Sequence, residues 1–392
     1  MFAICSDLDG TPDRIRYLEI ARFLNTEIVT SAGRGVGLEF GNSIYFDMPS
    51  HQFAYWNTDD AGQTMVRELI RSGHIDCFHS YGDHATSREH ARRALGELEK
   101  HDCRVECWVD HSTAITNFGA DNMQGSGDVP NSPAYHADLT YEHGVRFVWR
   151  GRVTSVVGQD RRRSANSLVS TRNPYASART AAKEFAKGTL GRLGNKKFAM
   201  HGANDLAMQV DLRDGHTVYE FMRCNPHWGG VTAGDTADGL ADVLTETFLN
   251  RLVRRKATCI LYTHLGKTKQ RNLVFPKQTI NALHKLAEIA DKDKILVTTT
   301  RRVLGYWLSR RHLGFALEER QSEEIISIDT SPLADVGMPY DLDGMTFYVQ
   351  DAETARILVD GVEVIDPQRN PADELGRQSI SIPWRWLEFP DL

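Results

Sequence analysis

Two carboxylates near the N-terminus have the spacing of a site that handles a metal ion or a proton. Asp7 and Asp9 follow the apolar run 2–5, and Gly10 directly after them lets the backbone turn sharply. On a continuing strand both side chains point to the same side of a sheet, where like charges are costly unless a cation or a shared proton separates their roles. The alternative is a solvated turn in which one carboxylate accepts backbone N–H groups.

Residues of the same kinds follow other apolar runs, and this recurrence favours a functional site over a solvated turn. These residues are His79, Asp110, His111, His227 and His264. In a parallel α/β barrel the C-terminal ends of the strands converge on one face, so we expect these side chains to meet the Asp pair there. A single histidine is more often structural, whereas several at equivalent positions are harder to explain in that way.

Carboxylates and imidazoles gathered in this way are suited to metal-assisted hydrolysis. An Asp-plus-His set suits a divalent ion, with Zn²⁺ as the expected metal, and leaves one coordination position for water. Such an ion lowers the pKa of its bound water and polarises a carbonyl oxygen. A second carboxylate then serves as the general base, and a histidine that does not bind the metal serves as the general acid.

The elements that must position these residues alternate between strand-like and helix-like segments through about residue 310. This alternation predicts an α/β domain over 1–316 with a mainly parallel sheet or barrel. Within it, about 160–197 carries ten Lys or Arg residues against two acids, which favours a solvated insertion or a groove for an anionic substrate. Short alternating runs over 317–392 predict a small antiparallel β accessory unit, in which Asp360 and Gly361 are typical of a hairpin turn.

The composition of the chain argues against nucleic acid as a partner and against a membrane-spanning protein. The chain has 392 residues, 41% of them hydrophobic, and a net charge of −6 that gives no reason to expect nucleic acid. There is no basic segment followed by an apolar stretch at the N-terminus and no window that approaches a membrane span, so we expect a cytoplasmic protein. The six cysteines fall mostly within apolar runs, which predicts reduced core residues.

Three motifs resemble those of the polysaccharide deacetylase (NodB-homology) superfamily, which includes carbohydrate esterase family four. They are Asp7-Leu8-Asp9, His79-Ser80 with His84, and Leu261-Tyr262-Thr263-His264. The resemblance covers roughly residues 1–310 and implies a distorted (β/α) barrel that removes acyl groups from a small-molecule or oligosaccharide substrate. It further implies that Asp7 is the general base, that Asp9 and His79 bind the metal, and that His264 is the general acid.

This chain departs from the family pattern at several positions, and the identity of the third metal ligand stays open. His79 and His84 are five residues apart rather than four, and that spacing rotates them away from one face of a helix. Either His84 or His111 is therefore the expected third ligand, and His111 stands near where the family places an arginine. Substrate contacts are expected from five further residues: Asp110, Tyr135, His136, His227 and Trp228.

Two other functions compete with a deacylase. Asp7-Leu8-Asp9-Gly10-Thr11 also resembles the nucleophile motif of haloacid-dehalogenase-type phosphatases, although Ala203 stands where that family has a magnesium-binding Asp. A phosphatase would leave the histidines at 79, 111 and 264 unexplained. The other alternative is a catalytically silent barrel that binds a glycan and uses the C-terminal β unit as an accessory module.

Overall fold

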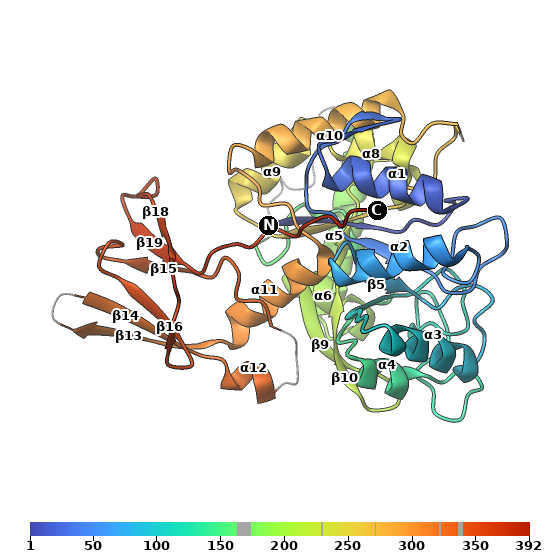
Figure 1. Ribbon diagram of the computed structural model, residues 1–392, viewed down its shortest axis with the longest axis horizontal. Helices are drawn as coiled ribbons and strands as arrows, with labels where there is room; N and C mark the ends of the chain where they lie inside the picture. Colours follow the sequence, from blue (N-terminus) through green and yellow to red (C-terminus); the bar gives the residue numbers. More distant parts are fainter. Residues whose placement is uncertain (163–173, 229, 271, 321–322, 336–339) are drawn as a thin grey trace. The chain divides into compact units, whose positions relative to one another are not determined.

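The computed structural model describes residues 1–162, 174–228, 230–270, 272–320, 323–335 and 340–392. The chain divides into two compact units, Met1–Arg301 with Leu387–Leu392, and Arg302–Trp386 (Figure 1). The division falls before the boundary expected at 316/317, and the last residues of the chain return to the first unit. Residues 163–173 of the expected basic insertion lie outside the described residues.

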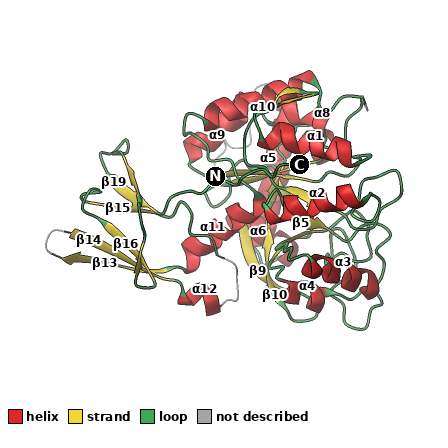
Figure 2. Ribbon diagram, viewed as in Figure 1, coloured by secondary structure: helices red, strands yellow, loops and turns green. Residues whose placement is uncertain are grey.

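A curled, mostly parallel sheet of ten strands forms a half-barrel in the first unit (Figure 2). In order across the sheet the strands are β8 (Val153–Thr154), β11 (Arg223–Cys224), β12 (Cys259–Thr263), β1 (Phe2–Ser6), β4 (Asn42–Ile44), β5 (Ile75–His79), β6 (Cys107–Val109), β7 (Phe147–Trp149), β10 (Thr217–Phe221) and β9 (Ala207–Asp211). Neighbouring strands run parallel except β9 and β10. The expected α/β class with a mainly parallel sheet is confirmed.

Strand β1 shows why this sheet forms. All five of its residues are buried, as is usual for a central parallel strand that is covered on both faces. The sequence does not predict strand β4, because its residues Asn42-Ser43-Ile44 lack an apolar run. Val29–Thr30 (β2) pairs with Gly33–Arg34 (β3) in a hairpin separate from the main sheet.

Helices flank the sheet, and their boundaries follow ordinary capping chemistry (Figure 2). Those of the first unit are α1 (Arg14–Asn25), α2 (Asp60–Arg71), α3 (Arg88–Lys100), α4 (Ala137–His143), α5 (Pro174–Arg192), α6 (Ala199–Ala203), α7 (Val231–Gly234), α8 (Ala237–Val243), α9 (Glu246–Arg255) and α10 (Lys277–Ala290), with a 3₁₀ turn at Lys196–Phe198. Asp59 caps α2 by accepting the Gly62 N–H at 2.9 Å, and the face of α2 that carries Val66 and Leu69 is buried. Helix α11 (Thr300–His312) crosses the division between the units.

The second unit contains two small sheets and one short helix, α12 (Ser331–Asp335). One sheet has the order β13 (Gly314–Arg320), β14 (Glu323–Asp329), β16 (Arg356–Val359) and β17 (Val362–Glu363), and the other has the order β15 (Thr346–Val349), β19 (Gln378–Ser381) and β18 (Gln368–Asn370). The expected C-terminal β unit is therefore present, although β14 and β16 pair in parallel. Asp360 and Gly361 join β16 to β17 with φ of 49° and 81°, as the hairpin signal predicted.

The six cysteines are buried and free, as expected. Among the described helices, none is both long enough and apolar enough to cross a bilayer.

Candidate active site

Adjacent parallel strands bring the sequence-predicted residues to one edge of the sheet. Asp7 and Asp9 follow β1, and His264 follows β12, which pairs with β1 in register from Phe2 with Cys259 to Ser6 with Thr263. His79 is the last residue of β5, and His111 follows the neighbouring strand β6. Because these strands are parallel, their C-terminal ends deliver all five side chains to the same edge.

The loops that leave these strands are tightly constrained. Gly10 has φ of 84°, and a Cβ on Gly266 would lie 2.4 Å from Thr11 Oγ1, so the turns after β1 and β12 pack directly on one another. Ser80 and Ser112 have φ of 53° and 42°, although each is a non-glycine residue directly after a site histidine. Backbone strain of this kind persists where the surrounding structure fixes it, and it is frequent at functional sites.

Asp7 is clamped by an arginine that the sequence analysis did not select. Arg223, on β11, donates from Nη1 to Asp7 Oδ2 at 2.6 Å and from Nη2 to Asp7 Oδ1 at 3.2 Å. Both side chains are fully buried, and the guanidinium lies over the Trp149 ring at 4.2 Å. Burial by itself lowers the pKa of an arginine, but the Asp7 carboxylate raises the pKa of Arg223 above its ordinary value. The two hydrogen bonds therefore fix the orientation of the Asp7 carboxyl group.

Asp9 is also buried and charged, but it is less completely satisfied. Burial favours its neutral form, yet the nearby His264, His79 and Lys267 lower the pKa of Asp9 below its usual value. Lys267 forms an ion pair with Asp9 Oδ2. Asp9 Oδ1 lies 3.4 Å from His264 Nε2, and within the described part of the chain it has no hydrogen-bond partner.

The tautomer of His264 follows from its contacts. Its Nδ1 lies 2.7 Å from the backbone oxygen of Asp235. Because a carbonyl oxygen can only accept, Nδ1 carries the proton and donates it. Nε2 is then left facing the carboxylates, 3.9 Å from Asp7 Oδ2 and 3.4 Å from Asp9 Oδ1. His264 is thus oriented to exchange a proton at Nε2.

His79 and His111 form the other side of the site. Their ring centroids are 4.7 Å apart, and Tyr45 stacks on His79 at 4.6 Å. Burial, together with the neighbouring His111, lowers the pKa of His79 well below its ordinary value. His79 is therefore neutral, which is the form that binds a metal. His111 Nδ1 lies 3.0 Å from Asp83 Oδ1.

The donor set fits a divalent cation in chemistry, although its atoms do not surround a common point. Asp9 Oδ1 and His79 Nδ1 are buried, and no described residue forms a hydrogen bond with either. Buried polar atoms without partners are costly, so an ion at this place would relieve both. Across the described ranges, no group of three or more His, Cys, Asp or Glu side chains is arranged to hold a metal.

The two candidate third ligands differ in position. The His84 side chain is 58% exposed, and its Nδ1 lies 3.9 Å from Asp47 Oδ1, whereas the His111 side chain is 13% exposed and lies beside His79. His84, which is five residues after His79 rather than four, is therefore placed in solvent by the turn after β5.

Two expected substrate contacts lie instead within the core. His136 is fully buried, its Nδ1 is 2.8 Å from Thr140 Oγ1, and its Nε2 is 2.8 Å from the Thr116 oxygen. Asp110 accepts the Trp108 Nε1–H at 2.7 Å, and burial raises the pKa of this carboxyl to about 7. Both ring nitrogens of His136 and Oδ1 of Asp110 are engaged by the protein, whereas Asp110 Oδ2 is buried with no hydrogen-bond partner among the described residues. A substrate contact from either residue stays a prediction.

Of the other three expected contacts, Tyr135 and Trp228 are closer to solvent, whereas His227 is buried. Tyr135 donates its hydroxyl to Asp214 at 3.1 Å and is partly buried. His227 and Trp228 follow β11, their rings stack with centroids 5.3 Å apart, and Trp228 is 54% exposed. Of these residues, Trp228 has the accessible aromatic face that a sugar ring could contact.

Arg223 and Lys267 are the charged site residues that the sequence analysis missed. Arg223 stands in the run 218–224, which is apolar except for Glu220 and Arg223 itself, and an arginine in a buried strand requires an acidic partner. That was the available signal. It does not identify which of the acids in the chain is the partner.

No known family model, curated protein or solved structure matches this chain.

Proposed function

We propose that this chain is a metal-dependent hydrolase that removes an acyl group, N-acetyl first among them, from a sugar or sugar-containing substrate. We further propose that the chain belongs to the polysaccharide deacetylase superfamily, which it resembles, and that its sheet is the distorted (β/α) barrel of that family. The observation that carries it is the meeting of Asp7, His264 and the Asp9–His79 pair at one edge of the sheet, with the two proton-transfer groups 3.9 Å apart. Proton donor and acceptor groups flanking a common space are what hydrolysis of an amide requires.

Asp9, His79 and His111 are the residues that would hold the metal. A Zn²⁺ ion bound by these three residues would lower the pKa of its bound water and polarise the acyl carbonyl oxygen. The unpartnered Asp9 Oδ1 and the neutral His79 support this assignment. His111 replaces His84 in the set because of its place beside His79.

Asp7 and His264 would move the protons. Asp7 takes a proton from the water that attacks the acyl carbon, and Arg223 orients the carboxylate for that transfer. His264 gives its Nε2 proton to the amine nitrogen as the C–N bond breaks. The Asp235 oxygen stabilises the protonated imidazole through Nδ1–H.

A direct test measures bound metal and acetate release on the same preparations. Asp7→Asn is expected to retain zinc and lose about 10³-fold in kcat, since a general base contributes on the order of 10²–10⁴. His79→Ala is expected to lose both metal and turnover. Full activity in either variant would contradict the role proposed for that residue.

The two competing functions give different results in the same assays. A haloacid-dehalogenase-type phosphatase would cleave a phosphate ester with Mg²⁺, and it would give the histidines at 79, 111 and 264 no role. A silent glycan-binding barrel would show neither bound metal nor turnover.

A further inference from the structure

Asp83 lies beside His111, one of the proposed metal ligands, and makes the two nitrogens of its ring unequal. Oδ1 of Asp83 is 3.0 Å from Nδ1 of His111. A carboxylate oxygen only accepts hydrogen bonds, and a second lone pair facing it at that distance would be repelled. Nδ1 therefore carries the proton, and the lone pair of Nε2 is left on the side of the ring turned away from Asp83.

The contact between these two atoms has the distance of a hydrogen bond but not its alignment. Nδ1 of His111 is buried and has no hydrogen-bond partner among the described residues, so the Asp83 oxygen lies off the direction of the N–H. The Asp83 side chain is 41% exposed and can rotate into line without disturbing the core. A cation on Nε2 would make the Nδ1–H a stronger donor and would favour that alignment.

The backbone holds both residues in place. The N–H of His111 donates to Asn117 Oδ1 at 2.9 Å, and Asn117 Nδ2 donates to the His111 oxygen at 3.1 Å. The turn that carries Asp83 packs on the segment at Asp47, so closely that a Cβ on Gly82 would lie 2.1 Å from the Asp47 backbone oxygen. The short distance between Asp83 and His111 thus comes from two fixed loops rather than from a chance encounter of surface side chains.

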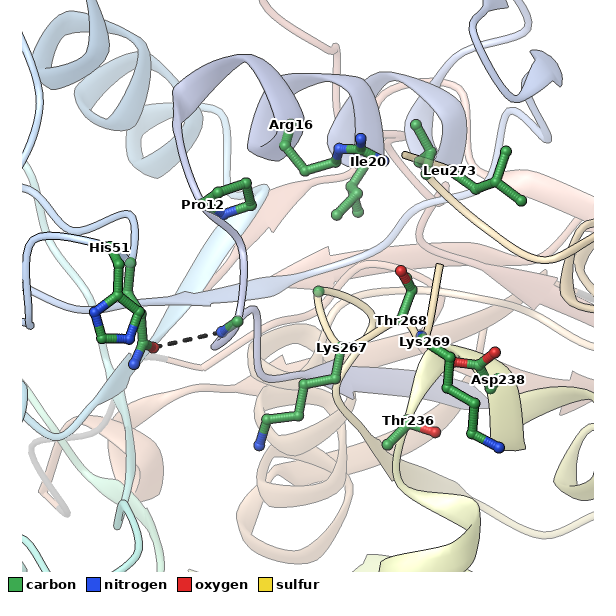
Figure 3. Close-up of a pocket in the computed structure, with 14 residues that line it drawn as sticks. Pro12, Arg16, Ile20, His51, Thr236, Asp238, Lys267, Thr268, Lys269 and Leu273 are labelled. Carbon is green, nitrogen blue, oxygen red and sulfur yellow. Dashed lines mark hydrogen bonds between the residues drawn. The ribbon is translucent and has the colours of Figure 1, made fainter. Parts of the chain in front are cut away.

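The other charged groups nearby have partners of their own. Asp83 and His111 line a cavity of about 730 Å³ together with Asp9 and Lys267. Lys267, which extends from the loop after β12 (Figure 3), forms its ion pair with Asp9. His84 is on the same turn as Asp83, but its Nδ1 faces the Asp47 carboxylate at 3.9 Å. His111 is therefore the residue on which Asp83 acts most directly.

A carboxylate beside a metal-binding imidazole has a known physical effect. It fixes the tautomer and the orientation of the ring, and it raises the basicity of the nitrogen that binds the ion. The loss of such a carboxylate typically weakens metal binding by about 10–100-fold. His111 is suited to this arrangement because its ring also contacts the ring of His79, with centroids 4.7 Å apart.

We propose that Asp83 is a positioning residue of the metal site, whose carboxylate keeps the His111 proton on Nδ1 and so presents Nε2 to the ion. This inference rests on the proposed function, which supplies the metal, and it deepens that proposal by naming the atom through which His111 binds. Asp83 acts on the ion through His111 and is not itself a ligand.

Nitrogen NMR of the metal-free protein, recorded above the titration range of histidine, reads the tautomer of His111 directly. We expect the Nδ1–H form in the unsubstituted protein and a shift towards the Nε2–H form in Asp83→Ala. Asp47→Ala, at the neighbouring and exposed Asp–His pair, is the matched control and should leave the His111 tautomer unchanged. An Nε2–H form of His111 in the unsubstituted protein would overturn the inference.

Zinc titration of the same metal-free variants by calorimetry measures the consequence for binding. Asp83→Ala should raise the zinc Kd by about 10–100-fold, and Asp47→Ala should leave it unchanged. Because Asp83 is partly exposed, neither substitution should move the urea midpoint of the metal-free protein. Asp83→Ala combined with His111→Ala should cost no more affinity than His111→Ala alone, since Asp83 acts through that ring. A Kd that Asp83→Ala leaves unchanged, or a loss that persists without His111, would overturn the inference.

Acetate release from N-acetylglucosamine and its oligosaccharides separates failure of this inference from failure of the proposed function. Zinc binding that depends on Asp83, without hydrolysis of any of these sugars, would support the positioning role and reject the deacylase. Hydrolysis with a zinc Kd that Asp83→Ala leaves unchanged would reject the positioning role and support the deacylase. A protein that binds no zinc would overturn both.

Discussion

The two sides of the candidate site are both buried and acidic, yet they are satisfied to very different degrees. On one side, both oxygens of Asp7 are engaged by Arg223. On the other, Asp9 Oδ1 and His79 Nδ1 have no hydrogen-bond partner within the described residues. A fully satisfied buried ion pair is rigid, whereas buried atoms without partners mark a place where something further binds. The Asp7 side is therefore fixed by its own contacts, and the Asp9 side is where we propose that the metal binds.

Breaking the Asp7–Arg223 pair should have the largest effect on stability. Arg223→Met leaves a buried carboxylate without its counter-ion, and we expect a loss of about 3–5 kcal/mol in the free energy of unfolding, measured with urea. Arg34→Met breaks an exposed pair with Glu27 and should cost less than about 1 kcal/mol. Similar losses in the two variants would show that the Asp7 side is not the rigid half of the site.

Metal binding should stabilise the protein through the other side of the site. Zinc at 100 times its Kd should raise the free energy of unfolding by about 2.7 kcal/mol, because the ion binds the folded state. His111→Ala should remove most of that increment. His84→Ala, which changes an exposed imidazole of the same type, should leave it intact. The opposite result would restore His84 as the third ligand.

A smaller effect comes from the buried His136. Burial lowers the pKa of His136 to about 4, so below pH 6.5 the unfolded chain binds a proton there that the folded chain does not. Stability therefore falls as the pH drops from 6.5 towards 4, by up to about 1.4 kcal/mol per pH unit for this group. His136→Gln should flatten the pH dependence of unfolding by that amount. An unchanged slope in His136→Gln would contradict the structural role given to this residue.

The sequence alone predicts the acids and histidines of the site but not the arginine that binds Asp7. Asp7, Asp9, His79 and His264 each follow an apolar run, and strand ends in a parallel sheet converge, so their meeting at one edge was predictable. Arg223 was not assigned to Asp7, because its partner lies 216 residues away and local pattern says nothing about such a pairing.

The errors elsewhere share a cause. Strand β4 has polar residues, and its place between β1 and β5 is fixed by its neighbours rather than by its own propensity. His136 was expected at the substrate, but it is buried and donates its Nε2–H to the Thr116 oxygen. In each case tertiary contacts outweighed the local signal.

Zinc titration of the metal-stripped protein by calorimetry tests the central claim most directly. The account predicts saturable binding of one ion per chain, abolished by Asp9→Asn and by His79→Ala and retained in His84→Ala. The absence of saturable binding, or binding that Asp9→Asn and His79→Ala leave unchanged, would contradict it.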